Sequence, residues 1–501
     1  MPPATKYITT SGAELNQLED ALRRERSVRV TFNAVAWRYY EGQHRQPLKS
    51  DGTGTDDNVI VNVTETIVDK GVANLLGVDD EGMVVGLTFD IVDEPGEPGF
   101  VGGSLAELPR MRRQQPKANP SQDYLDAVWN ANNQQILLND VLLSCSVTGH
   151  AFVKLLPDGK EGEDGSPLPR LVNMNPDNVA VFWAEDDMDR VLWYRIEYAR
   201  ARQDIVRDVR EDGTDGDQWL IYNYRRATEI ASWESDGEPQ VWPYAWPPVV
   251  DWKNRPNPRG YYGLSDVGLL GRLNDSLNFV MSNTQRILKH HAHPKTIGLG
   301  IKAGDVEATA VDGFWTVQAG TESANIYNLE MQSDLASSLQ FSQMLLRSMF
   351  DIGRELNPGT VADKLGQITN FGLRVLYSDS LSKAGIKRML AGEALKRICR
   401  RLLELGGYDP RVKLNVIWPD PLPRDALQQA QALQIDAAHG LSQETYLERR
   451  GYDAAQEEQR STLTRIQGQQ AALAQRDQTR AALLPNGMIN GGFGNSRQPP
   501  G

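Results

Sequence analysis

The chain has 501 residues, of which 40% are hydrophobic and 24% charged, and its length suggests about three domains. The net charge of -13 argues against a general affinity for nucleic acid, which needs basic patches that displace counterions from phosphates. No apolar run reaches the roughly 18 residues of a membrane span, and the first residues hold no signal-peptide core. Cys145 and Cys399 lie in apolar helical sequence, which predicts buried free thiols in a reducing, aqueous compartment.

Residues 13–256 predict one α+β body. Amphipathic spacing predicts its helices, and short runs rich in β-branched and aromatic residues over 150–252 predict its strands. Outside those runs, the predicted elements are helices over residues 13–42, 62–77 and 121–149 and a strand over 86–93. Ser121 is the expected N-cap of the third helix, and Gly149 is its expected end. Helices and strands that occur in separate runs favour an α+β fold.

Residues 264–405 carry the most informative pattern, in which two helices enclose a β-rich insert. The first helix is expected over 265–290, with Ser265 or Asp266 as its cap, and the second over 333–355. Apolar residues of the first helix recur at near-heptad spacing, which predicts packing of one helix against another. These residues are Leu270, Leu273, Leu277, Val280 and Ile287. Two helices that leave a body and return form a stalk, which favours a part of an assembly over a catalyst.

The chain after the second helix enters a Pro-Gly loop over residues 357–367, which breaks the helix. Residues 368–406 contain no proline and predict one long helix. The remaining predicted segments are a strand over 411–418, Ala- and Gln-rich helix over 424–484 and a disordered tail over 485–501.

Basic side chains gather in residues 357–410, which hold nine Lys and Arg against five Asp and Glu. Those on the long helix are interpreted as a polar face that pairs with acids of a neighbouring subunit. Lys364, which lies in the loop, is the better candidate for contact with a polyanion. The insert is acidic instead, with Lys302 against five carboxylates over 296–331.

Motifs for nucleotide or metal chemistry are absent from the sequence. It holds no GxxxxGK[ST], GxGxxG, HExxH or GxSxG, which weighs against an ATPase or helicase. A metal site at His290, His291 and His293 needs a further ligand, and a helix end, where imidazoles suit the dipole, is the favoured interpretation. The acidic run 185–189 lacks the spacing of a calcium loop and is interpreted as a turn between strands.

The ordered set of segments resembles the portal proteins of tailed bacteriophages, especially those of siphovirus-like phages. The start of the long helix, KLGQITNFGLRVL, departs from the small residues usual in that family. The stretches that carry the resemblance are WRYYEGQHRQPL with NVTETIVDKGVANLLG, LLSCSVTGHAFVKLLPDGK, GYYGLSDVGLLGRLNDSLNFVMSNTQ, VADKLGQITNFGLRVLYSDSLSKAGIKRML and GLSQETYLERRGYDAAQEEQRSTLTRIQ.

The resemblance implies an α+β fold with a mostly helical portal architecture. The implied parts are a flexible N-terminus (1–12), an α/β wing (13–256) to which strand 411–418 returns, two stem helices (264–293 and 333–355), a small β-containing clip (294–332), a tunnel loop (356–367), a long spine helix (368–406), a helical crown (424–484) and a disordered tail (485–501). Such a chain is a structural protein, not an enzyme, and no cofactor is expected.

The resemblance also assigns residues to three of these parts. The tunnel-loop residues expected to face DNA are Asn357, Thr360, Asp363, Lys364 and Gln367. The clip residues expected to dock partners are Lys302, Asp305, Glu307, Asp312, Trp315 and Glu322. The stem residues expected to pack are Leu270, Leu273, Leu277, Val280, Leu339 and Leu346.

The function that the resemblance implies is a homo-oligomeric ring, usually a dodecamer, at one vertex of the virion capsid, assembled in the host cytoplasm. Double-stranded DNA would pass through its channel without sequence specificity during packaging and later ejection. The terminase large subunit would dock on the ring, and a head-completion or adaptor protein would replace it. The major capsid and scaffolding proteins are further expected partners, and no membrane is.

Two other functions stay open at this point. One is an enzyme of the packaging machine, a nuclease or ATPase, although the missing phosphate loop and carboxylate–metal motif weigh against it. The other is a different capsid or adaptor protein with similar helical patterning.

Overall fold

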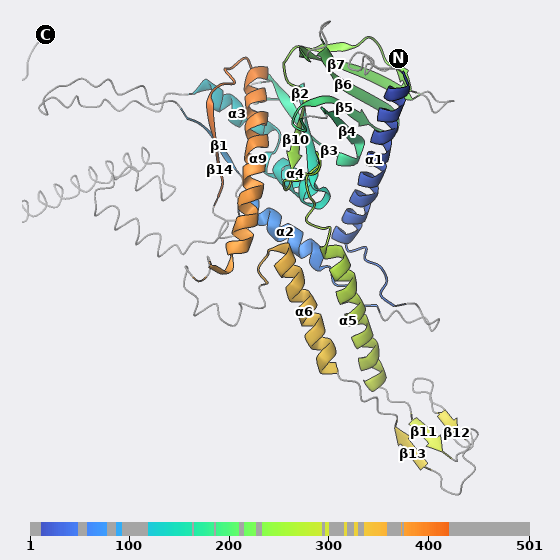
Figure 1. Cartoon of the computed structure of the whole chain (residues 1–501). Coiled ribbons are helices and arrows are strands. Elements are labelled where there is room, and N and C mark those ends of the chain that lie inside the picture. Colours follow the sequence, from blue (N-terminus) through green and yellow to red (C-terminus); the bar gives the residue numbers. More distant parts are fainter. Residues whose placement is uncertain are drawn as a thin grey trace, which may run out of the picture. The chain divides into compact units, whose positions relative to one another are not determined.

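The structure describes residues 12–48, 58–77, 87–92, 119–162, 165–184, 187–209, 215–226, 233–292, 296–299, 315–317, 325–328, 335–357, 372 and 375–419. Figure 1 shows this computed structural model, in which helices and mostly antiparallel sheets form the α+β fold predicted from the sequence. All described residues belong to the first of two compact units, residues 1–422, so the crown predicted over 424–484 lies outside them.

The largest core lies between four helices and two small sheets. The helices are α2 (Val63–Leu76), α3 (Pro120–Ala131), α4 (Gln134–Thr148) and α9 (Ser378–Leu405). In one sheet β2 (His150–Glu161) lies between β3 (Pro167–Met174) and β10 (Val249–Lys253), and in the other β1 (Thr88–Val92) pairs with β14 (Lys413–Ile417). Fully buried side chains such as Leu76, Leu125 and Leu402 fill the space between these elements. The strand predicted over 411–418 thus pairs with the strand predicted over 86–93.

The single helix predicted over 121–149 is wrong, because the chain forms α3 and α4 with a break between them. Asn133 has a φ of 51°, in the left-handed region that ends a helix, and the Asn132 side chain donates to the Val128 carbonyl at 2.8 Å. The N-cap of α3 is Asn119, whose side chain accepts from the Ser121 backbone, so Ser121 is not the cap. Gly149, with a φ of 91°, ends α4 as predicted.

A second core lies on one face of a six-stranded antiparallel sheet within the described residues. Its strands are β4 (Val179–Trp183), β5 (Val191–Glu197), β6 (Ala201–Val209), β7 (Asp215–Arg226) and β8 (Trp233–Ser235), in that spatial order, with β9 (Gln240–Trp242) paired to β7. Tyr194 and Ile196 of β5 belong to this core, whereas Trp193 belongs to a cluster on the opposite face, because side chains alternate along a strand. The acidic run 185–189 falls between β4 and β5, as predicted.

Helix α1 (Gly12–Tyr40) is held beside this sheet by polar contacts. The Arg29 guanidinium donates to the carbonyls of Pro176 and Val179, both at 2.7 Å. Arg26 Nη1 donates to Glu197 Oε2 at 2.7 Å. These contacts join α1 to the 3-10 turn η2 (Pro176–Asn178) and to β4 and β5.

Helices α5 (Leu270–Ala292) and α6 (Leu335–Gly353) correspond to the two helices predicted around the insert. The first was expected to begin at residue 265, which is wrong, because Ser265 and Asp266 lie in a turn before α5. Ser265 Oγ donates to the Val147 carbonyl at 2.5 Å, and Asp266 pairs with α9, so neither side chain caps α5. The described strands of the insert are β11 (Thr296–Leu299), β12 (Trp315–Val317) and β13 (Asn325–Asn328), which form one sheet.

The long helix predicted over 368–406 has a turn at Tyr377, and Gly372, Val375 and Leu376 before that turn are also helical, whereas 368–371 and 373–374 lie outside the described residues. Helix α9 starts at Ser378, after Tyr377 in a turn with φ -86° and ψ 1°, and ends at Leu405. Among the described helices, none combines the length and the apolar content that crossing a membrane requires. Both cysteines are buried free thiols, as predicted, and burial raises the pKa of Cys399 to about 12.

His150, the first residue of β2, is buried among aromatic rings. Its ring centroid lies 4.6 Å from that of Phe152 and 5.4 Å from that of Tyr261. The chain is tightly packed around it, since a Cβ on Gly149 would lie 2.5 Å from the Gly263 carbonyl oxygen. Burial lowers the pKa of His150 from 6.5 to about 3, although the charge of Asp251 partly opposes this shift.

We expect His150 to make the body less stable as the pH falls. The unfolded chain takes up this proton near pH 6.5, whereas the folded chain does so only near pH 3, so stability is lost between those values on acidification. One such group changes the free energy of unfolding by at most about 1.4 kcal/mol per pH unit. The variant His150→Gln should therefore show a flatter dependence of the urea midpoint on pH in that window. Equal slopes in variant and wild type would contradict the assignment.

Candidate functional site

The pair formed by α5 and α6 packs along the seam predicted from the sequence. Leu270 and Leu277 of α5 are buried in one cluster with Leu345, Met349 and Phe350 of α6. Three other expected seam residues, Leu273, Val280 and Leu346, are partly buried against it. Val63 and Ile67 of α2 complete the cluster, so α2 packs against the first turns of α5 and the last turns of α6. Leu339, the sixth expected residue, is 50% exposed and lies outside the cluster.

A polar stripe on α5, which the sequence analysis missed, holds a second segment of chain. Asn274, Asn278 and Ser282 are fully buried and recur at four-residue spacing, so they share one helix face. Asn274 Oδ1 accepts from the Val63 backbone at 3.0 Å, and Asn278 Oδ1 accepts from the Val61 backbone at 3.0 Å. Ser282 Oγ accepts from the Val59 backbone at 2.9 Å. The spacing of these polar residues was visible in the sequence, but their partners more than 200 residues away were not.

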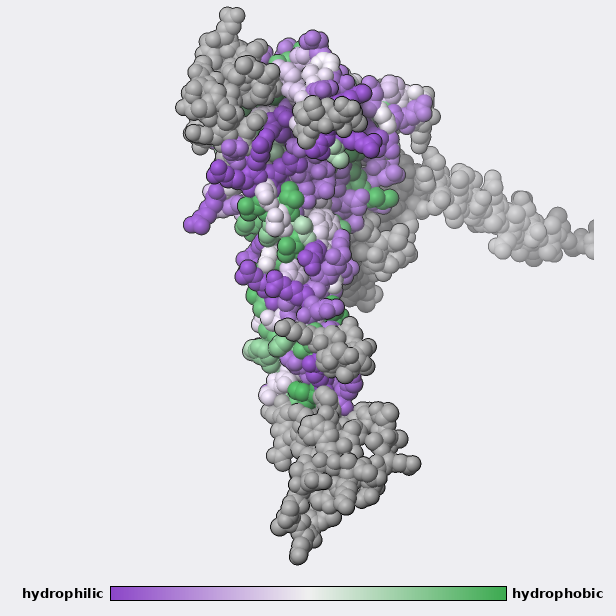
Figure 2. Space-filling model, turned by 90° about the vertical axis from the view of Figure 1, so that its right-hand side faces the viewer, coloured by the Kyte–Doolittle hydropathy of each residue, from purple (hydrophilic) through white to green (hydrophobic). Residues whose placement is uncertain are grey.

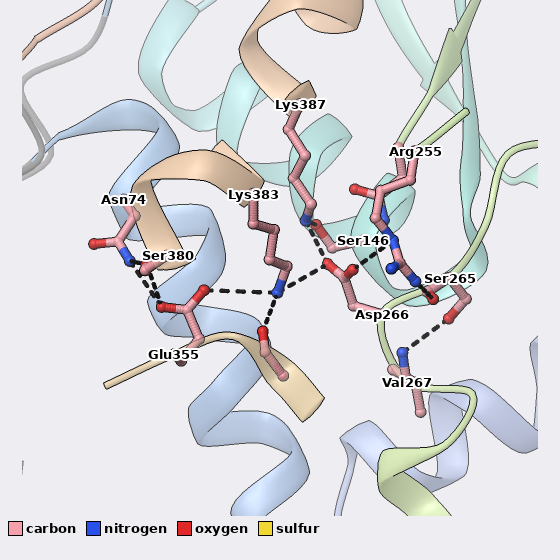
Figure 3. Close-up of polar contacts among 12 residues, drawn as sticks. Asn74, Ser146, Arg255, Ser265, Asp266, Val267, Glu355, Ser380, Lys383 and Lys387 are labelled. Carbon is pink, nitrogen blue, oxygen red and sulfur yellow. Dashed lines mark hydrogen bonds and ion pairs between the residues drawn. The ribbon is translucent and has the colours of Figure 1, made fainter. Parts of the chain in front are cut away.

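Charged side chains from the turn before α5, the end of α6 and the first turns of α9 contact one another, as Figure 3 shows, and those of Asp266, Glu355, Lys383 and Lys387 are buried. Asp266, just before α5, forms an ion pair with Lys387 of α9. The Lys383 ammonium lies 3.8 Å from Asp266 Oδ2, and Arg255 Nε lies 3.2 Å from Asp266 Oδ1. Lys387 also donates to Ser146 Oγ of α4 at 3.2 Å. The Asp266 carboxylate therefore links the turn before α5 to α9 directly, and Lys387 extends this link to α4.

A second carboxylate extends this ion cluster to the end of α6. Glu355 Oε1 lies 3.6 Å from the Lys383 ammonium. Its other oxygen accepts hydrogen bonds from Ser380 Oγ at 2.8 Å and from Asn74 Nδ2 at 2.9 Å. Lys383 also donates to the Gly353 carbonyl at 2.8 Å, which satisfies an oxygen at the last turn of α6 (Figure 3). In the sequence, Glu355 precedes the predicted tunnel loop and Ser380 follows it.

Burial and neighbouring charges set the protonation of this cluster. Burial raises the pKa of Glu355 above its usual value, although Lys383 opposes that shift. Burial lowers the pKa of Lys383, which Asp266 and Glu355 oppose. Burial also disfavours the charge of Asp266, but Lys387, Lys383 and Arg255 outweigh it and lower the pKa of that carboxyl. Asp266 therefore stays ionised at neutral pH and holds both lysines.

The interpretation that basic residues of the long helix pair with a neighbouring subunit is wrong for five of them. Lys383 and Lys387 are buried in the ion cluster, and Arg388 donates to the carbonyls of Asn74, Leu75 and Pro419. Arg397 pairs with Asp251 at 3.1 Å, and Arg401 donates to the carbonyls of Pro247 and Val249. Their partners lie far away in sequence but inside the same chain, which helical spacing alone does not reveal.

The residues expected to face DNA or to dock partners fall mostly outside the described ranges. Asn357 lines a cavity of about 400 Å³ between α6 and α9. Trp315 lies in β12, where its backbone is opposite Ile297 of β11. The expected residues outside the description are Thr360, Asp363, Lys364, Gln367, Lys302, Asp305, Glu307, Asp312 and Glu322. No group of three or more possible metal ligands occurs in the part of the chain that the structure describes.

Apolar side chains are exposed on the helices around this site. Val28, Phe32 and Val35 recur on one face of α1 and are 72%, 43% and 42% exposed. Figure 2 shows hydrophobic patches within hydrophilic surface on the side that carries α1 and α5. Further exposed apolar residues on α5, α6 and α9 are Phe279, Leu288, Leu339, Phe341, Met344, Ile386 and Met389. Grouped apolar surface of this kind marks contact sites for protein partners.

Residues 275–471 match the family model described as phage portal protein, SPP1 Gp6-like. The resemblance to phage portal proteins is confirmed. The matched segment is less than half of the chain, and it contains most of α5 and all of α6, α9 and β14. Glu355, Lys383 and Lys387 of the ion cluster thus lie within the matched segment, residues 275–471, which we call the portal segment, whereas Asp266 precedes it. No curated protein is similar enough to count as a match.

Two solved structures contain similar chains. One is the virion of a native gene transfer agent particle, at 13% identity and a TM-score of 0.39, with 66% of this chain and 84% of that chain covered. The other is the neck of an empty gene transfer agent particle computed with C6 symmetry, at 14% identity and a TM-score of 0.36, with 66% and 82% covered.

Removal of one lysine should show how strongly the ion cluster supports the portal segment. The variant Lys387→Met leaves Asp266 buried without its main partner, and loss of one partner of a buried pair costs about 3–5 kcal/mol. Urea unfolding followed by tryptophan fluorescence should show that loss. Lys396→Met is the matched control on the same helix, because among the described residues Lys396 pairs only with Glu393, at the surface, and the change should alter stability by less than about 1 kcal/mol. Similar midpoints for the two variants would refute the role of the cluster.

Proposed function

We propose that this chain is the subunit of a homo-oligomeric portal ring at one vertex of a virion capsid. The match of residues 275–471 to the portal family model carries this proposal, because it covers the helices that would surround a channel. Exposed apolar residues on α1, α5, α6 and α9 support it, since copies packed around an axis would cover them. In this ring, usually a dodecamer in such proteins, α5 and α6 act as the stem and the sheet β11–β13 acts as the clip.

Genomic DNA passes through this channel during packaging and later ejection. A conduit must not hold DNA, because each contact between a cation and a phosphate strengthens binding. The net charge of -13 and the burial of Lys383 and Lys387 within the chain suit that requirement. The loop 356–367 acts as the tunnel loop, with Lys364 as its cation. Glu355 and Ser380 anchor the chain on either side of that loop.

Other proteins dock on the ring in turn. The terminase large subunit binds the acidic clip during packaging, and a head-completion or adaptor protein binds there afterwards. Opposite charge would favour such docking, because the clip segment 296–331 holds five carboxylates and one lysine. The chain itself acts as a structural protein without enzymatic activity, and the packaging ATPase is a separate partner.

The ring can be tested by native mass measurement and negative-stain imaging of the purified chain. A closed ring with a central hole is expected, and Phe279→Glu on α5 should dissociate it, because a charge would enter an apolar contact between copies. Tyr198→Glu is the matched control, since Tyr198 is a similarly exposed aromatic residue outside these helices, at 46% against 50% for Phe279. A stable monomer of wild-type protein at high concentration would contradict the proposal.

The tunnel loop can be tested through its charge. Lys364→Glu should leave the native mass of the ring unchanged and alter DNA packaging or retention, because it places a negative charge beside the DNA phosphates. Lys364→Arg keeps the charge and should behave like wild type. Packaged DNA per particle is the quantity to measure. Loss of the ring in Lys364→Glu would instead make the residue structural.

A further inference from the structure

Four arginines line a cavity of about 280 Å³ between α1 and the six-stranded sheet. Arg23 and Arg26 come from α1, Arg195 from β5 and Arg202 from β6. Glu197 and Trp233 complete the polar and aromatic lining. Neither the portal family match nor the proposed ring gives this cavity a role, since it lies before residue 275.

The sheet fixes the positions of two of these arginines. Arg195 is directly opposite Asp204 on β6, and Glu197 is directly opposite Arg202. Asp204 is fully buried, accepts from Arg195 Nε at 3.2 Å and forms an ion pair with Arg202. The guanidinium of Arg195 lies 4.3 Å above the Trp193 ring, and that of Arg202 lies 5.0 Å above the Tyr224 ring. Ion pairs and ring contacts together hold both planar groups at the cavity wall.

Helix α1 supplies the other two arginines. Arg26 is fixed, because its Nη1 donates to Glu197 and its Nε donates to the Asp177 carbonyl at 3.2 Å. Arg23 is exposed and has no hydrogen-bond or ion-pair partner among the described residues. A guanidinium has five N–H donors, and the bonds described for Arg26 and Arg202 use two each. Donors therefore remain for a ligand on both fixed arginines as well as on Arg23.

The side chains described at the cavity carry more positive than negative charge. Among the described side chains, four guanidinium groups stand against the carboxylates of Glu197 and Asp204, a sum of +2 in a chain of -13. A phosphate monoester carries about -1.5 to -2 at neutral pH and accepts through three oxygens, so it matches that excess better than a single carboxylate does. The cavity volume is close to about 300 Å³, the lower end of the range for ligand pockets, which suits a small anion.

We propose that this cavity binds a phosphate group, carried by a nucleotide or by free inorganic phosphate. Arg195, Arg202 and Arg26 form the preorganised wall, and Arg23 closes over the anion from α1. Trp233, which also lines the cavity, offers an aromatic surface on which the base of a nucleotide stacks.

The test uses calorimetric titration of the purified full-length chain with inorganic phosphate, with adenosine monophosphate and with adenosine. We expect both phosphate compounds to bind and adenosine not to bind. Arg23→Ala should weaken phosphate binding about tenfold, because it removes charge-assisted hydrogen bonds without touching the core of the fold. Arg24→Ala is the matched control, since Arg24 is the next residue of α1 and lines a different groove, beside Phe32 and Leu264.

Two results would overturn the proposal. One is absence of binding for both phosphate compounds at millimolar concentration, and the other is an equal loss in Arg23→Ala and Arg24→Ala, which would show only diffuse attraction. Trp233→Ala separates the two sources of phosphate. A loss confined to adenosine monophosphate assigns the cavity to a nucleotide, and unchanged binding of both compounds assigns it to the free anion. The thermal midpoint of each variant confirms that the fold is intact.

Discussion

Two lysines of α9 neutralise two carboxylates that would otherwise be buried without partners, and the helix ends of the portal segment depend on this arrangement. Asp266 precedes α5, Glu355 follows α6, and Lys383 and Lys387 lie in the first turns of α9. A buried charge without a partner costs several kcal/mol, so separation of these helix ends would be strongly unfavourable in free energy. The same contacts anchor both sides of residues 358–371, because Glu355 accepts from Ser380. The ion cluster therefore joins the two described segments that flank this interval.

The helices around this cluster use their faces in different ways. The face of α5 toward α6 is apolar, and the adjacent face with Asn274, Asn278 and Ser282 is polar and binds the backbone of residues 59–63. Both of these faces are filled from within the chain, whereas other apolar residues, such as Phe279, stay exposed and lie outside the core clusters of the described residues. A ring would cover such surface, which is why the exposed faces and the proposed assembly fit together.

Charge is distributed very unevenly over this acidic chain. The basic residues of α9 are largely used inside the molecule, by Asp266, Asp251 and backbone carbonyls. On the large sheet, Arg195 and Arg202 both pair with the buried carboxylate of Asp204. The net charge predicted neither the pairing of the α9 cations nor the arginines on the sheet, because a sum of -13 contains no information about which side chains face one another.

Local patterns in the sequence were enough to predict the α+β class, both helices of the stem segment, the seam of Leu270 and Leu277, and the free buried cysteines. Helical spacing and β-branched runs act over a few residues, so the sequence carries them directly. Tertiary structure alone decided that Asn133 splits one helix into two, that Asp266 pairs with Lys387 in place of capping α5, and that Asn274 holds Val63. It also decided that arginines of α1, β5 and β6 meet at one cavity. Each of these depends on groups brought together from distant parts of the chain, where burial and ion pairing override local preference.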